Sequence, residues 1–227
     1  MNAIIPLIEV GDLGRRLTHL SLGDYDDDGL NYLSKLPNLT ALMLEGAGPK
    51  RPLGNVVPKL SFLTVGKMQK TTLGGLAQLH GLQLTAGCGH LDTCESPGLK
   101  TLFVAGAAPQ CLDHINRFQQ LQTLALWSRK KGWSFTALTQ CPLLNDFAFE
   151  GPAHQYWDSL PQTLKRVSIE KTNGSARLAD HLSDVPVLSI GYNPTDSGDD
   201  GFYRGDLLEV GDPFRTIEGD VFMADIV

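Results

Sequence analysis

The hydrophobic positions of this chain recur in one short pattern, apolar-x-x-apolar-x-apolar, along most of its length. Nine copies of the pattern begin 19 to 23 residues apart. In each copy the fourth and sixth positions are apolar, while the third and fifth vary. This alternation of period two predicts a β-strand with one buried face. The copies begin at Leu17, Leu39, Leu60, Leu79, Leu99, Leu121, Leu144, Leu164 and Val185.

The segments between the copies predict the path that returns the chain to the next strand. Residues 29–39, 112–121, 135–144 and 178–187 carry apolar side chains at near-helical spacing, and several contain a proline just before the next strand. Proline keeps the preceding residue out of the α region, so we expect it to end each short helix. About twenty residues leave room for one strand and one short return, so successive strands must be parallel. Because one unit cannot bury its own apolar face, the copies must stack into a continuous core.

This repeat resembles the leucine-rich-repeat family, in a degenerate bacterial-type form, across residues 17–191. The resemblance implies an α/β solenoid, or horseshoe, of about nine repeats. A parallel β-sheet would line its concave face, with short helices or irregular returns on the convex face. Residues 1–16 would cap the N-terminal end, and the acidic residues 192–227 the C-terminal end. The family's usual asparagine after the strand is present in one copy only, as Asn193. Glycines near that turn predict tight bends instead.

Charge and composition narrow the class of partner. Hydrophobic residues make up 42% of the 227 and charged residues 19%, which is typical of a folded protein. Of the net charge of −6, residues 192–227 carry −7, from nine acids and two bases. An acidic segment and a longest basic run of three residues, 129–131, argue against a nucleic-acid partner. No apolar stretch approaches membrane-spanning length, so we expect no membrane partner either.

The third, fifth and seventh positions of each copy should face outward on the concave side. They place large apolar side chains among charged ones on a single surface. Aromatic residues commonly dominate binding energy, while flanking charges select the partner and speed the encounter. The alternative is a one-residue error in register, which would move the same side chains into the core. The candidate partner-binding residues are Met43, Glu45, Phe62, Phe103, Trp127, Asp146, Glu150, Arg166 and Glu170.

These observations predict a non-catalytic module that binds another protein through its concave face. Acids outnumber bases on the C-terminal half of that face, so we expect a partner with a basic patch. The resemblance suggests an immunity protein that neutralises a toxin, and the alternative is an adaptor or effector that recruits a target. An enzyme with a site at a repeat edge is a third, weaker reading. The chain has no G-x-S-x-G motif, and Gly66-Lys67 lacks the rest of a phosphate-binding loop. We therefore predict no catalytic residues and no cofactor.

Two segments could be interpreted as metal sites, and each of them also has a simpler explanation. Asp24, Asp26 and Asp28 match the first carboxylates of a calcium loop, but Lys35 stands where its last ligand should be. We favour an acidic turn and predict no metal site.

Cysteines and histidines also gather around residues 88–114, at positions 88, 90, 94, 111 and 114, but their spacing matches no standard zinc pattern. The four cysteines are too few and too scattered for a disulfide framework. The first residues lack the basic start of a secretory signal. We therefore expect a reducing, cytoplasmic location.

Overall fold

The computed structural model describes most of the repeat region. The described residues are 13–23, 29–47, 52–67, 73–89, 91–151, 160–170 and 185–191. The predicted C-terminal cap and most of the predicted N-terminal cap lie outside these residues, so the proposed end caps stay predictions. None of the helices in the described ranges has the length and apolar character needed to cross a membrane.

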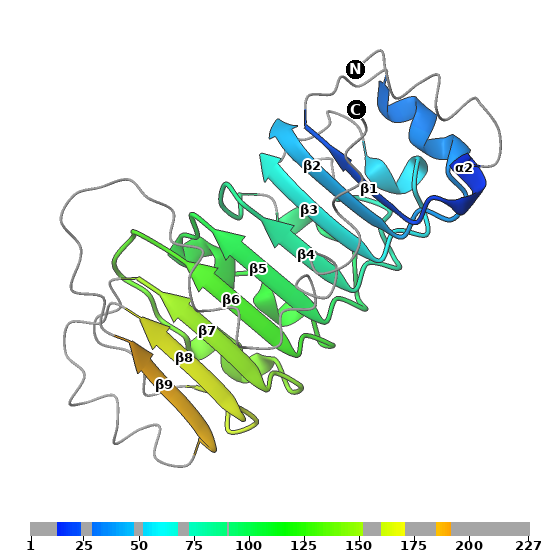
Figure 1. Ribbon diagram of the computed structural model, residues 1–227. Helices are drawn as coiled ribbons and strands as arrows, with labels where there is room; N and C mark the ends of the chain where they lie inside the picture. Colours follow the sequence, from blue (N-terminus) through cyan, green and yellow to red (C-terminus); the bar gives the residue numbers. More distant parts are fainter. Residues whose placement is uncertain are drawn as a thin grey trace.

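Nine parallel strands form one open sheet in which each strand pairs with the next along the chain (Figure 1). Equivalent positions of successive copies lie side by side, for example Leu102 with Leu124 and Leu124 with Phe147. The predicted leucine-rich-repeat solenoid is thereby confirmed. The strands are β1 (His19–Leu22), β2 (Ala41–Ala47), β3 (Phe62–Lys67), β4 (Gly81–Leu84), β5 (Thr101–Ala105), β6 (Thr123–Trp127), β7 (Asp146–Glu150), β8 (Arg166–Glu170) and β9 (Val187–Gly191).

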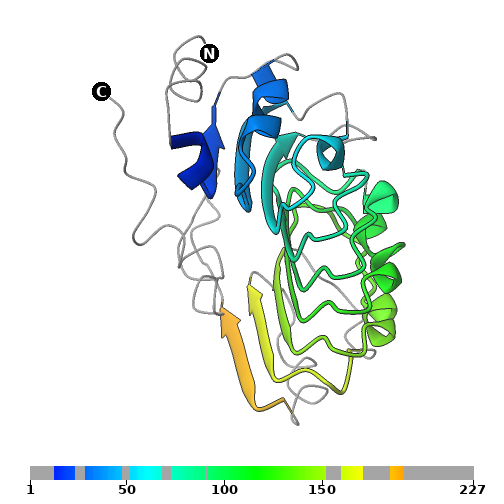
Figure 2. The same ribbon diagram turned by 90° about the vertical axis from the view of Figure 1, so that its right-hand side faces the viewer.

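The described returns between strands are 3-10 helices and turns, shorter than the near-helical segments predicted at 29–39, 112–121 and 135–144. Most of the segment predicted at 178–187 lies outside the described residues. The described returns stack on the outer side of the curve and the strands line the inner side (Figure 2). A 3-10 helix rises more per residue than an α-helix, so it spans the short return with few residues. A single α-helical turn, α2 (Leu13–Arg16), precedes the first strand. The 3-10 helices are η1 (Gly29–Lys35), η2 (Leu53–Asn55), η3 (Leu91–Thr93), η4 (Pro109–Leu112), η5 (Ile115–Arg117) and η6 (Thr136–Gln140).

A tight turn precedes the strand in seven of the repeats. In the turn before β2, the amide of Leu39 donates to the carbonyl of Leu36 at 3.2 Å, and the amide of Leu60 donates to Val57 in the same way at 3.1 Å. Pro37 therefore occupies the second position of its turn, where its fixed φ is favourable. The helices η1 and η6 end before Pro37 and Pro142, in agreement with the prediction that proline stops a helix, and proline also builds the turn that leads into the next strand.

The inward side chains of the strands form one continuous core. Leu44, Leu63, Leu82 and Leu102 are at most 2% exposed. Each fully buried side chain of this size contributes roughly 1.5–3 kcal/mol of hydrophobic stabilisation. The register predicted from the sequence is confirmed, since these fourth and sixth positions point inward along the described strands.

A disulfide joins Cys88, in the loop after β4, to Cys111 in η4 of the next repeat, with Cα atoms 5.5 Å apart. The sequence reading predicted no such bond. In the chain-entropy account, closing a loop of this length stabilises the fold by about 3 kcal/mol. Cys94 and Cys141 are buried free thiols. Burial raises the pKa of both, for Cys141 to about 11.

Candidate functional site

The outward positions of the strands form the concave face. The register places Met43 and Phe103 in the row of fifth positions and Trp127 and Glu150 in the row of seventh positions. Phe62 lies in the row of third positions. The seven described candidates in β2 to β7, together with Arg166 of β8, thus lie on one side of the sheet. Glu170 lies beside Glu150 by strand pairing, but its side chain is outside the described residues.

Each large apolar residue on this face has a small neighbour on an adjacent strand. Phe62 pairs with Ala41 and Gly81. Phe103 pairs with Ala125, and Ala105 pairs with Trp127. These small neighbours are themselves buried. Met43 and the three aromatic side chains are all half-buried rather than enclosed in the core.

Phe103 and Trp127 form the nearest aromatic pair on the face. They stand on adjacent strands, offset by one outward position. A strand spacing of about 4.8 Å and a rise of about 3.3 Å per residue place their Cα atoms about 8 Å apart. The indole Nε1 of Trp127 is buried and has no hydrogen-bond partner within the described part of the chain. A buried N–H without an acceptor costs about 1–3 kcal/mol, so Trp127 is held at some expense in stability.

Asp146 and Arg166 pair with each other across β7 and β8. Both guanidinium nitrogens Nε and Nη2 donate to the two carboxylate oxygens, the second at 2.9 Å. The Asp146 side chain is 10% exposed and that of Arg166 is 42% exposed. The hydrogen bond to Asp146 raises the pKa of the Arg166 guanidinium. Because this two-bond pair offsets the two charges, Asp146 contributes little to the net field of the face.

The sequence reading treated Asp146 and Arg166 as separate contact residues and missed their pairing. The signal was present, because both occupy the third position of consecutive copies, and equivalent positions lie side by side in the sheet.

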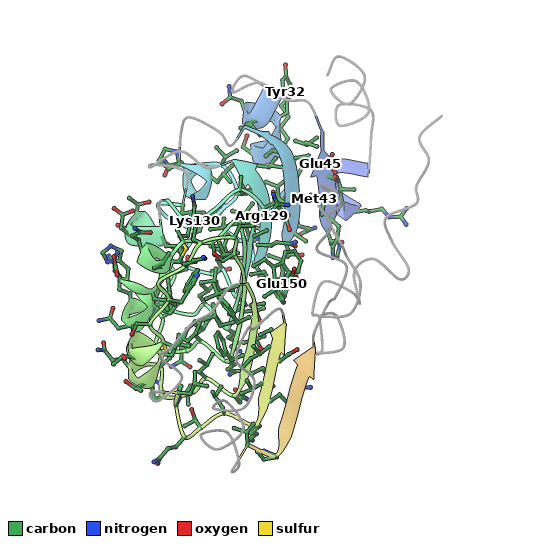
Figure 3. The ribbon with its side chains drawn as sticks, turned by 90° about the vertical axis from the view of Figure 1, so that its left-hand side faces the viewer. Tyr32, Met43, Glu45, Arg129, Lys130 and Glu150 are labelled. Atoms are coloured by element: carbon green, nitrogen blue, oxygen red, sulfur yellow. A yellow bond between two sulfur atoms is a disulfide. The ribbon has the colours of Figure 1, made fainter. Side chains whose placement is uncertain are left out.

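Glu45 and Glu150 supply the other described carboxylates of the face. Glu45 is exposed and Glu150 is half-buried. The register shifts after Leu44, so that Ala47 pairs with Lys67 and β2 holds one extra residue in the stretch that contains Glu45. Such a bulge twists the strand locally and re-aims side chains. Both glutamates lie where their strands end, on the edge that faces the viewer in Figure 3.

A shallow hollow lies on the convex side, between η4, η5 and η6, and measures about 400 Å³. Asp113 is the only titratable side chain among its lining residues, and neither a histidine nor a lysine lines it. A general-base mechanism needs a nucleophile within hydrogen-bond reach of its base. The lining of this hollow supplies no such pair.

The structure tests the zinc interpretation but not the calcium-loop interpretation. Cys88 and Cys111 are bonded to each other, so neither can act as a zinc ligand in this state. Among the described residues, no three histidine, cysteine or acidic side chains gather closely enough to hold a metal ion. Asp24, Asp26, Asp28 and His90 lie outside the described residues.

Comparison with known proteins identifies the fold and no closer relationship. No protein-family model and no curated protein matches the chain. Among solved structures, it is similar to an internalin (inlF) of Listeria monocytogenes, with 14% identity and a TM-score of 0.54 over 84% of this chain and 67% of the other. It is also similar to internalin C2 of the same organism, with 18% identity and a TM-score of 0.53 over 83% of this chain and 91% of the other. The chain is a leucine-rich-repeat solenoid of the kind seen in these internalins.

Proposed function

We propose that this chain is a non-catalytic recognition module that binds another protein through its concave face. The observation that carries the proposal is the set of large apolar side chains on the outward face of the sheet. Met43, Phe62, Phe103 and Trp127 are half-buried there, although the core is already filled by the inward positions. Packing of the solenoid alone does not require large side chains at these positions.

Phe103 and Trp127 are the proposed anchors. Anchor residues in interfaces are few, are enriched in tryptophan and tyrosine, and lie in pockets from which water is excluded. Ala125 and Ala105, which pair with Phe103 and Trp127, are buried, so the exposed parts of the two rings form this part of the surface. Phe62 and Met43 extend the same surface toward the N-terminal repeats.

The charge of the face favours a partner with a basic patch. Since Asp146 and Arg166 offset each other, the proposal rests on Glu45, near the end of β2, and on Glu150 and Glu170, the last residues of β7 and β8. Such charges mainly accelerate association, and their effect decreases as salt is added.

The biological role we propose is that of an immunity protein which neutralises a toxin. An adaptor or effector that recruits a target protein is the alternative. An enzymatic site at a repeat edge is less favoured, because the hollow on the convex side lacks a catalytic pair. Binding that abolishes the activity of a cognate toxin supports immunity, while binding without inhibition supports an adaptor.

The test combines affinity capture with a matched pair of variants. The partner captured by the intact protein is purified, and its Kd is measured for the Phe103→Asp/Trp127→Asp variant and for Gln78→Asp/Gln120→Asp. Gln78 and Gln120 are exposed in turns before β4 and β6, so the control adds the same two charges away from the face. We expect the first variant to bind at least about thirtyfold more weakly, as loss of an anchor implies.

The control should bind within about threefold of the intact protein. Circular dichroism establishes that both variants are folded. Equal affinities of the two folded variants would contradict binding of the partner to the concave face.

A further inference from the structure

The loop that follows β6 has a fixed conformation built around the hydroxyl of Ser128. This hydroxyl donates to the carbonyl of Ala107 at 2.7 Å. It accepts from the amide of Lys130 at 2.9 Å and from the indole Nε1 of Trp133 at 3.2 Å. A hydroxyl has one donor and two acceptor positions, so Ser128 uses all of them. Ser128 itself is 8% exposed.

Trp133 anchors the other end of the loop. Its ring is 1% exposed and lies edge-on to Phe149 of β7, with ring centroids 5.3 Å apart. The indole Nε1 also donates to the carbonyl of Lys130 at 3.0 Å. Both the amide and the carbonyl of Lys130 are therefore held by the two ends of the loop. Gly132 has a φ of +84°, a conformation that glycine adopts without strain, and it turns the chain back toward Trp133.

This loop presents three consecutive cationic side chains to solvent. Arg129, Lys130 and Lys131 are all exposed. Arg129 and Lys130 are labelled in Figure 3 on the side of the molecule where the strands end. The loop borders the concave face, since it follows Trp127 directly and the amide of Ser128 donates to the carbonyl of Glu150 at 2.8 Å.

We propose that loop 128–132 is a second binding site, which takes a short acidic segment of a partner protein. The exposed ammonium groups of Lys130 and Lys131 can pair with carboxylates through charge-assisted hydrogen bonds. The backbone of the loop is already ordered by Ser128 and Trp133, so binding carries little further cost in backbone entropy. The site goes beyond the concave face, because its ligand is acidic and its contacts come from the loop alone.

Protein carboxylates fit this loop better than a nucleic acid does. A nucleic-acid site follows the phosphate backbone with many cations, and its affinity grows with the number of phosphates neutralised. Here three cations lie in one loop, with Glu150 at the end of the neighbouring strand and a net charge of −6 on the whole chain. A long polyanion would meet repulsion beyond the loop, while a segment of a few acidic residues would not.

The first test uses a hexaglutamate peptide as the probe and the full chain labelled with 15N-tryptophan. The chain contains three tryptophans, and the indole N–H of Trp133 is bonded to Ser128 and Lys130 inside the loop, so its resonance reports on the site. At about 50 mM salt we expect this resonance to shift saturably as the peptide is added. Raising the salt to about 500 mM should weaken binding at least about fivefold. A Trp133 resonance that does not respond to the peptide would overturn the proposal.

Matched variants test whether the loop itself is the site. Lys130→Glu/Lys131→Glu should weaken peptide binding at least about tenfold. Lys59→Glu/Lys100→Glu makes the same change in net charge at exposed positions of other repeats, and should change the affinity by less than about threefold. Equal losses in the two variants would show that only the overall charge matters, which contradicts a site in the loop.

A competing probe decides the class of ligand. An oligothymidine with six phosphates has a charge comparable to that of the peptide. Weaker binding of this oligonucleotide than of hexaglutamate supports a protein partner. Binding of the oligonucleotide that is tighter than that of the peptide and is lost in Lys130→Glu/Lys131→Glu would overturn the assignment to protein carboxylates. Neither outcome depends on the concave face, so failure here leaves the proposed anchors to be judged by their own experiment.

Discussion

Replacing Ser128 by alanine should destabilise the solenoid well beyond the loss of one surface hydroxyl. The substitution removes the only side-chain donor that the structure shows for the carbonyl of Ala107 and one of two acceptors of the Trp133 indole. It also frees the amide of Lys130, which lies close enough to the surface to regain water. An unsatisfied buried carbonyl costs about 1–3 kcal/mol, and each of the weaker losses about 0.5 kcal/mol. We therefore expect a loss of about 2–4 kcal/mol in the free energy of unfolding.

Equilibrium urea unfolding, followed by circular dichroism and by tryptophan fluorescence, measures this loss. Ser134→Ala is the matched control, because Ser134 is exposed and its hydroxyl bonds only to the hydroxyl of Thr136 among the bonds that the structure shows. The control should lose less than about 0.5 kcal/mol, as surface substitutions usually do. If Ser128→Ala is as stable as Ser134→Ala, the loop is not held by the Ser128 network and the reasoning is refuted.

Three further predictions concern close packing, charge and thiol reactivity. A Cβ on Gly54 would stand 2.2 Å from the backbone of the neighbouring repeat, while one on Gly89 would meet nothing within 4 Å. Thermal unfolding should therefore show that Gly54→Ala is markedly less stable than Gly89→Ala. Equal melting temperatures of the two variants would contradict the close approach. Arg166→Met should lower the free energy of unfolding, measured in urea, by about 1–2 kcal/mol, because it leaves Asp146 buried without its partner and solvent screening limits the loss. Restored stability in Arg166→Met/Asp146→Asn would confirm the cause. An Arg166→Met variant as stable as the unchanged protein would refute it. Burial raises the pKa of Cys141 to about 11. At pH 8 the thiol of the folded protein should therefore resist iodoacetamide, and it should react only in urea or as the pH approaches that value. Rapid alkylation of Cys141 in the folded protein at pH 8 would contradict its burial.

The disulfide gives a separate test of the predicted cytoplasmic location. Disulfides persist mainly in oxidising compartments, whereas a reducing cytoplasm keeps thiols free. If the protein acts in the cytoplasm, rapid alkylation of whole cells followed by mass spectrometry should find Cys88 and Cys111 as thiols. Finding them bonded in cells would contradict that location and agree with the bond in the structure.

The alternation of apolar residues was sufficient to predict the strands and their inward faces. Leu102 and Val104 alternate with Phe103 in the sequence, and a period of two leaves only one way to bury the pair. The regular spacing of the copies then predicted parallel pairing, because a return of about fifteen residues is long enough to bring the chain back to the end of the sheet where the previous strand began. Even the rows of the concave face followed, since Phe103 and Trp127 were assigned by their positions within the copies.

The remaining features depend on contacts between repeats, which spacing alone does not determine. The bulge at Glu45 adds one residue to β2 without changing the alternation before it. The bond between Cys88 and Cys111 depends on how the loop after β4 approaches η4 of the next repeat, and their 23-residue separation carries no specific signal. The Ser128 network is likewise invisible in the sequence, because it requires Trp133 to fold back into the core beside Phe149.

The central claim is that a partner protein sits on the concave face, and site-specific photo-crosslinking tests it most directly. A photoreactive phenylalanine analogue is placed at Phe103 in one protein and at Gln140, an exposed residue of η6 on the convex side, in another. Both proteins are illuminated with the captured partner, and the crosslinked products are identified by mass spectrometry. The account predicts a covalent product from position 103 and none from position 140. A product from position 140 alone would place the partner on the convex side and contradict the account.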